Sequence, residues 1–159
     1  MNKIQILKLV VSLLLPLGLG AIAGMLTSQS VPNWFANLAK PPFNPPNWIF
    51  GSVWTALYIL MGISLFLIWK EDASKIRRLA ILVFMIQLLL NFGWSFIFFY
   101  FKMIGLAFVE IILLWISVIA MFILFYKIKP IAAYMNIPYI LWVSFAMVLN
   151  GAFFFLNRR

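Results

Sequence analysis

Tryptophan and carboxamide side chains lie deep inside long apolar runs of this chain, where few polar groups are expected. Four tryptophans, Trp54, Trp94, Trp115 and Trp142, lie several residues inside the ends of these runs. Tryptophans of membrane proteins normally lie at the interface with water, so deeper indoles need another explanation. Flat rings with N–H donors suit a pocket for a flat polycyclic ligand, although the same rings could simply fill a core.

Three of the runs carry stripes of small, polar and aromatic residues at helical spacings of three and four. Because an unpaired amide is costly in lipid, Gln87, Asn91 and Asn150 are expected to point into the protein interior. There they would either bond between helices or orient a ligand. The stripes are Gly51, Thr55, Tyr58, Gly62, Phe66 and Trp69; Gln87, Asn91, Trp94 or Ser95, and Phe98; Tyr139, Trp142, Ala146, Asn150, Phe153 and Asn157.

Conventional catalytic and metal-binding side chains are scarce. The chain of 159 residues has no cysteine and no histidine. Thiolate and imidazole ligands, a nucleophilic cysteine and the commonest general base are therefore excluded. We expect no metal site, no cofactor and no ordinary hydrolytic or transfer chemistry.

One acidic residue, Glu110, lies inside the runs, on a stripe with Ala107 and Leu114. A carboxyl group inside a membrane segment is a functional candidate by default. Its nearness to the end of the run leaves a second interpretation, a carboxyl hydrogen-bonded at the interface or paired with Lys102. A single carboxylate without a basic partner gives little support to proton-coupled transport.

The elements that must position these side chains are five apolar runs, in a chain that is 66% hydrophobic and 9% charged. Each run is near the ~20 residues that a helix needs to cross a hydrocarbon core of ~30 Å. Backbone groups in lipid must pair within their own helix, so an all-α membrane protein is predicted, with one transmembrane domain over residues 1–159. The first run is longer than a typical signal-peptide core, so we expect it to be a span. The predicted helices cover residues 6–26, 48–69, 79–101, 104–126 and 132–156.

The charges predict topology rather than nucleic-acid binding. The net charge is +9, but the basic residues are spread over every connection and both termini. By the positive-inside rule the amino terminus is predicted to be cytoplasmic and the carboxy terminus outside. The cytoplasmic group would hold Lys3, Lys8, Lys70, Lys75, Arg77, Arg78, Lys127 and Lys129, against Lys40, Lys102, Arg158 and Arg159 on the other side.

The connection between the first two runs is long and rich in proline. Five prolines lie within fifteen residues. They predict a stiff, non-helical segment that loses little entropy on binding, which suits a lid over a ligand. The alternative is an interfacial loop anchored by Trp34 and Trp48. The residues assigned to the lid are Lys40, Pro41, Pro42, Pro45 and Pro46.

Motifs along essentially the whole chain resemble one family, the tryptophan-rich sensory proteins and translocator proteins (TspO/MBR), once called peripheral-type benzodiazepine receptors. Five motifs occur in the family's order, which makes the resemblance specific. They are Lys40-Pro41-Pro42 with Pro45-Pro46-Asn47-Trp48-Ile49-Phe50-Gly51, Val53-Trp54, Leu57-Tyr58 and Met61-Gly62; Leu90-Asn91 with Trp94-Ser95 and Phe98-Phe99; Leu114-Trp115; Pro138-Tyr139 with Trp142 and Phe145-Ala146; and Leu149-Asn150 with Leu156-Asn157.

The resemblance implies a five-helix bundle, usually a homodimer, with a pocket beneath the first loop. It implies binding of porphyrins, notably protoporphyrin IX, and of isoquinoline and benzodiazepine-like compounds, and mitochondrial members also bind cholesterol. Together with the stripes, it predicts a ligand-binding set consisting of Trp34, Phe35, Trp54, Tyr58, Asn91, Trp94, Trp142, Ala146 and Asn150.

Two departures from the family pattern concern the fifth run. Phe154 stands where relatives often have tryptophan, which would weaken an aromatic contact. The sterol pattern has Leu149 and Arg158 but no tyrosine between them, so it does not support sterol binding.

Three functions are consistent with these residues and with the resemblance. The first is a membrane receptor or carrier that binds porphyrin-type tetrapyrroles. The second is an enzyme that degrades protoporphyrin by light-dependent oxidation, with Trp54 and Trp142 as the implied catalytic pair. The third is a structural or assembly partner whose core is tightly filled.

Overall fold

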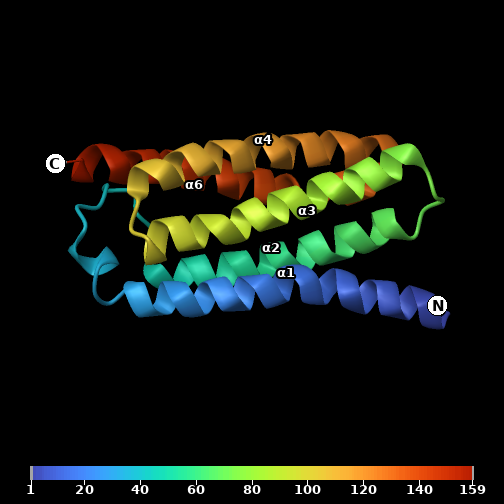
Figure 1. The fold of residues 1–159 in the computed structure, drawn as a ribbon, viewed down its shortest axis with the longest axis horizontal. Coiled ribbons are helices and arrows are strands. Elements are labelled where there is room, and N and C mark those ends of the chain that lie inside the picture. Colours follow the sequence, from blue (N-terminus) through green and yellow to red (C-terminus); the bar gives the residue numbers. More distant parts are fainter. Residues whose placement is uncertain (1, 159) are drawn as a thin grey trace.

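The computed structural model describes residues 2–158 and is built from helices within that range (Figure 1). Five helical segments are long and apolar enough to cross a membrane, which confirms the predicted all-α membrane class. Arg159, one of the basic residues predicted to lie outside, falls beyond the described residues. The elements are α1 Lys3–Ser30, η1 (a 3₁₀-helix) Phe35–Asn37, α2 Asn47–Trp69, α3 Lys75–Ser95, η2 (a π-helix) Phe96–Tyr100, α4 Ile104–Ile128, α5 Pro130–Tyr134 and α6 Ile137–Asn157.

Polar side chains set where the helices begin. The Asn2 Oδ1 atom accepts from the Gln5 backbone N–H at 2.9 Å, so α1 begins earlier than the apolar run does. The Ser74 hydroxyl accepts from the Arg77 N–H at 3.1 Å and caps α3 in the same way. The helices therefore extend past the apolar residues that predicted them.

Two of the predicted helices are not uniform. The third run changes to the π-helix η2 over its last turn, before a sharp connection in which Lys102 has φ 59°. The fifth run is divided into α5 and α6 at Met135–Asn136. Pro138 lacks an N–H and disfavours helical geometry in the residue before it, so a helix running through this point would lose a backbone bond.

Neighbouring helices pack in the pairs α1 with α2, α3 with α4, and α4 with α6. Figure 1 shows the amino terminus and the α2–α3 connection at one end of the bundle. The proline-rich connection, the turn before α4 and the carboxy terminus lie at the other end. We call this second end the loop end.

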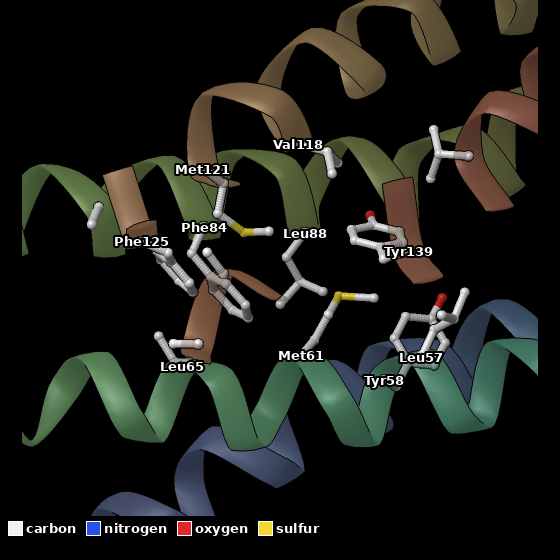
Figure 2. Packing of buried hydrophobic residues seen from close by; sticks show 14 of the residues in the cluster. Leu57, Tyr58, Met61, Leu65, Phe84, Leu88, Val118, Met121, Phe125 and Tyr139 are labelled. Carbon is white, nitrogen blue, oxygen red and sulfur yellow. The ribbon is translucent and has the colours of Figure 1, made fainter. Parts of the chain in front are cut away.

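Away from the loop end, the bundle is filled by its own side chains. Figure 2 shows Met61 and Leu65 of α2 facing Phe84 and Leu88 of α3 across this core. The rings of Phe84 and Phe125 stack with centroids 6.2 Å apart. This cluster holds the helices together in one half of the bundle, and the candidate site lies in the other half.

Candidate ligand-binding cavity

A cavity of about 740 Å³ lies inside the loop end of the bundle. Its volume is in the range of pockets that hold drug-sized ligands, roughly 300–1,000 Å³. No residue with a charged side chain is among the described residues that line it. The lining comes from α1 (Leu17, Gly20, Ala21, Ala23, Gly24, Thr27, Ser28), the first connection (Val31, Phe35), α2 (Asn47, Phe50, Gly51, Trp54, Thr55, Tyr58), α3 and η2 (Trp94, Ser95, Phe98, Phe99) and α6 (Trp142, Ala146, Leu149, Asn150, Phe153).

Nine of the 24 residues that line the cavity are aromatic. Trp54 stacks on Tyr58 with ring centroids 5.5 Å apart, both on α2. From α6, Trp142 meets the ring of Phe50 edge-on at 5.9 Å. On the α3 side, Trp94 stacks on Phe98 at 5.0 Å. The wall therefore offers both ring faces and ring edges to a flat apolar ligand.

The indole N–H group on the α3 wall has a hydrogen-bond partner, and the one on the α6 wall has none among the described residues. The Trp94 indole donates to Asn150 Oδ1 at 2.9 Å, and Asn150 Nδ2 donates to the Ile104 carbonyl at 3.1 Å. The Asn150 side chain therefore uses both its oxygen and its nitrogen in hydrogen bonds within the protein, one of which fixes Trp94. The Trp142 Nε1 atom is buried and has no partner within residues 2–158. An unpaired buried donor costs about 1–3 kcal/mol. Because this atom is shielded from the cavity, the indole must turn before it can donate to a ligand acceptor, and that bond would recover the cost.

A chain of buried hydrogen bonds supports the cavity from behind. The Tyr58 hydroxyl donates to Asn91 Oδ1 at 2.8 Å, and Asn91 Nδ2 donates to the Tyr139 hydroxyl at 3.0 Å. Tyr139 in turn donates to Gln87 Oε1 at 2.7 Å. This chain links α2, α3 and α6 and fixes the Tyr58 ring, on which Trp54 stacks.

The proline-rich connection covers the loop end of the cavity and is held there at several points. Phe35 of η1 is 5% exposed and packs against Phe98, Phe99 and Phe153. The Asn157 side chain of α6 makes a two-point contact with one backbone unit, accepting from Ala39 N–H at 2.9 Å and donating to Ala39 O at 3.0 Å.

These contacts bear on the choice between a lid and an interfacial anchor. Trp34 packs edge-on against Phe98 at 5.6 Å, whereas Trp48 is 72% exposed. Lys40 Nζ lies 5.3 Å from the centre of the Phe35 ring. The connection thus contains a buried ring, as a lid would, and an exposed aromatic residue follows it in the first turn of α2, as an interfacial anchor would.

Comparison with known proteins agrees with this architecture. The family model described as the TspO/MBR family matches residues 12–156. The chain belongs to the TspO/MBR family. Tryptophan-rich protein TspO of Archaeoglobus fulgidus is 41% identical over 153 residues, covering 96% of this chain and 99% of that protein. The Chlorobaculum tepidum protein of the same name is 37% identical and covers 99% of both chains. The human Translocator protein is 35% identical over 119 residues, which cover 74% of this chain and 70% of the human protein.

For this TspO/MBR member, the structure brings most of the predicted ligand-binding residues to one cavity. Of the predicted residues, Asn91 and Trp34 are not among the lining. Asn91 lies behind Tyr58 and accepts a hydrogen bond from its hydroxyl. Trp34 packs against Phe98, which does line the cavity. The predicted lid residues Lys40, Pro41, Pro42, Pro45 and Pro46 belong to the covering connection and do not line the cavity either. The predicted residues that line it are Phe35, Trp54, Tyr58, Trp94, Trp142, Ala146 and Asn150.

The contribution of α1 to this site was not predicted from the sequence. Small and hydroxyl residues of α1 form one wall, although the sequence offered no aromatic or amide stripe there. The usable signal was the repetition of Gly20, Gly24 and Thr27 or Ser28 on one face of the run.

Other predicted positions lie away from the cavity. Trp115 of α4 does not line the cavity, and its indole donates to the Ser144 hydroxyl of α6 at 2.8 Å. Phe154 stacks on Phe108 of α4, at 6.4 Å, so its replacement of tryptophan does not alter the cavity wall. Leu149, part of the incomplete sterol pattern, is buried in the cavity wall.

Glu110 is 8% exposed, and neither carboxyl oxygen has a hydrogen-bond partner within residues 2–158. Pairing with Lys102 is not found in the described part of the chain. The ion pair found there joins Lys129 to Glu71 instead. Glu110 does not line the cavity, so the ligand site does not use it.

Proposed function

We propose that this protein is a membrane receptor or carrier that binds porphyrin-type tetrapyrroles, such as protoporphyrin IX, inside its helix bundle. One observation carries the proposal: a cavity of about 740 Å³ is walled by three tryptophans, and the indole N–H of one of them, Trp142, is buried without a partner. A flat macrocycle would bury its faces against these rings. Its ring nitrogens or carboxylates supply acceptors for Trp142 Nε1 once the indole turns toward the ligand.

The uncharged lining suits the body of such a ligand but not its acidic groups. Propionate side chains would be expensive to bury without a cation. Lys40, on the connection that covers the cavity, is exposed and supplies that cation at the edge of the site. Because the chain has no histidine or cysteine, the proposal favours a metal-free ring or one held through its faces and propionates.

Binding of protoporphyrin IX is tested by titrating the purified protein and following the fluorescence of the ligand. Wild type is expected to give saturable binding. Trp142→Phe keeps an aromatic ring but removes the N–H donor, so Kd should rise about tenfold, equivalent to roughly 1.4 kcal/mol.

Trp115→Phe is the matched control, because Trp115 lies outside the cavity, and its Kd should stay within twofold of wild type. Non-saturable binding by wild type, or equal Kd values for both variants and wild type, would contradict the proposal.

The second candidate function uses the same cavity. Trp54 and Trp142 both border it, as light-dependent oxidation of bound protoporphyrin requires. Under illumination, the rate of protoporphyrin bleaching is compared between wild type and the double variant Trp54→Phe plus Trp142→Phe, each saturated with ligand. Equal rates would exclude degradation through these tryptophans and leave binding intact.

We also propose that the end of the bundle holding the amino terminus faces the cytoplasm. The described basic residues of the larger group lie at that end, and cytoplasmic loops carry the excess of lysine and arginine. Reporter domains fused to each terminus should show a cytoplasmic amino terminus and an external carboxy terminus. The opposite pattern would reverse the assignment.

From the family we further propose a homodimer, and isoquinoline or benzodiazepine-like compounds as competing ligands. Sterol binding is not included, because its pattern is incomplete.

A further inference from the structure

We infer that the cavity is filled and emptied sideways, through an opening between α1 and α2 that leads directly into the lipid. The route is a property of the cavity itself, and it rests on the proposed function only for the identity of the ligand. Three independent features of the structure support it.

The first feature is where the cavity wall is exposed. Among the lining residues, those with exposed surfaces all belong to α1 and α2. The lining residues of α3, η2 and α6 are all buried or half-buried. The exposed set is Ala21, Gly24 and Ser28 on α1 and Asn47, Gly51 and Thr55 on α2.

The second feature is a change in how closely α1 and α2 approach along their length. At Gly62, an added Cβ atom would lie 2.8 Å from the Ser12 carbonyl oxygen, so the two backbones are in contact. At Gly20, it would lie 2.2 Å from the Tyr58 ring. At Gly24 and Gly51, nearer the loop end, it would meet no atom within 4 Å. The helices therefore close the bundle below Gly20 and leave it open above.

The third feature is the chemistry of the opening. A gap facing lipid must not present unpaired donors. The hydroxyls near it bond to their own helices: Thr55 to Gly51 O at 2.8 Å, Thr27 to Ala23 O at 2.9 Å, and Ser28 to Met25 O at 2.8 Å. Apart from Asn47, which begins α2 at the loop end, the opening is thus lined by small side chains whose hydroxyl groups are hydrogen-bonded.

Residues 2–158 show no comparable route at the loop end. There the proline-rich connection is held by the buried Phe35 ring and by the two bonds from Asn157 to Ala39. Thr55 lies eight residues into α2, about 12 Å along the helix axis. An apolar ligand dissolved in the bilayer can therefore reach the opening without crossing the covering connection.

The test narrows the opening without touching the packed part of the bundle. Leucine at Gly24 and Gly51 has room for its Cβ atom and projects into the gap. Gly18→Leu is the matched control, because Gly18 also has open space around it but does not line the cavity. Each variant is reconstituted in lipid nanodiscs, and binding and release of protoporphyrin IX are followed by stopped-flow fluorescence.

The Gly24→Leu plus Gly51→Leu variant is expected to slow both association and dissociation by tenfold or more. Gly18→Leu should leave both rates unchanged. Wild-type rates in the double variant would overturn the inference. So would a change confined to one of the two rates.

A second readout does not depend on porphyrin binding. The chain has no cysteine, so Ala146→Cys places a single thiol on the α6 wall of the cavity. A lipid-soluble phenylmercury reagent should label this thiol faster than a membrane-impermeant sulfonated analogue, measured by mass spectrometry. Adding Gly24→Leu and Gly51→Leu should slow the lipid-soluble reagent at least tenfold, and adding Gly18→Leu should not.

Equal labelling by both reagents, unaffected by the leucines, would show access from water and reject the lateral route. Absence of saturable porphyrin binding together with blocked labelling would reject the proposed ligand but retain the route.

Discussion

Replacing Gly62 by alanine should lower the free energy of unfolding by about 1–3 kcal/mol and weaken ligand binding at the same time. The new Cβ atom would lie 2.8 Å from the Ser12 carbonyl oxygen and 2.9 Å from Leu13 Cα. Both atoms belong to the α1 backbone, which cannot rotate away as a side chain can. Helix α1 must therefore shift, and α1 carries one wall of the cavity. Thermal unfolding in detergent and protoporphyrin titration measure the two effects.

Gly18→Ala is the matched control on α1. Its Cβ atom would meet nothing within 4 Å, and alanine is a better helix former than glycine by roughly 0.5–1 kcal/mol. The control should therefore be neutral or slightly stabilising, opposite in sign to Gly62→Ala. If both variants melted alike, contact between the α1 and α2 backbones would not be the reason for glycine at position 62.

Replacing Phe35 by alanine should release the proline-rich connection and raise the Kd for protoporphyrin about a hundredfold, because the ring also forms part of the cavity wall. Truncating a buried phenylalanine costs about 3–5 kcal/mol, and this ring is 5% exposed among Phe98, Phe99 and Phe153. Most of the loss should fall on docking of the connection, because the helices retain their own core cluster. Limited proteolysis of the connection and protoporphyrin titration would measure the two effects.

Two further variants test whether the connection is held by its specific contacts with the bundle or by exposed hydrophobic side chains. Asn157→Ala removes both bonds to Ala39 and should cause a smaller increase in proteolysis than Phe35→Ala. Trp48→Ala removes a larger ring that is 72% exposed and should have little effect on either measurement. An effect of Trp48→Ala as large as that of Phe35→Ala would mean that the connection is held by the membrane interface instead of the bundle.

The sequence alone determined the class of protein and the location of its helices. Runs of apolar residues with the charges between them leave no alternative to spans, because backbone groups in lipid must pair within a helix. The finer bounds of the helices depended on single residues. Asn2 and Ser74 lengthen α1 and α3, and Pro138 breaks the fifth run, which the apolar pattern had joined.

Helical periodicity also identified the faces that carry Trp94 and Trp142, since stripes at spacings of three and four share a face. Trp54 was predicted from its depth in the run and from the family motif. Depth alone did not distinguish these three from Trp115, which bonds to Ser144 and does not line the cavity. Periodicity also placed Asn91 in the ligand site, whereas the structure places it behind Tyr58. Periodicity assigns a side chain to a face but not to a distance from the bundle axis.

Only the tertiary structure decided that one half of the bundle is filled and the other half hollow. All five spans are strongly apolar, so composition cannot show where their side chains meet. The result depends on the separation of α1 and α2, which is set by contacts between residues distant in sequence: Gly62 against Leu13, and Gly20 against the Tyr58 ring that Asn91 holds in place. A sequence does not reveal that a row of small residues forms a cavity wall, because this depends on whether the neighbouring helices cover those residues.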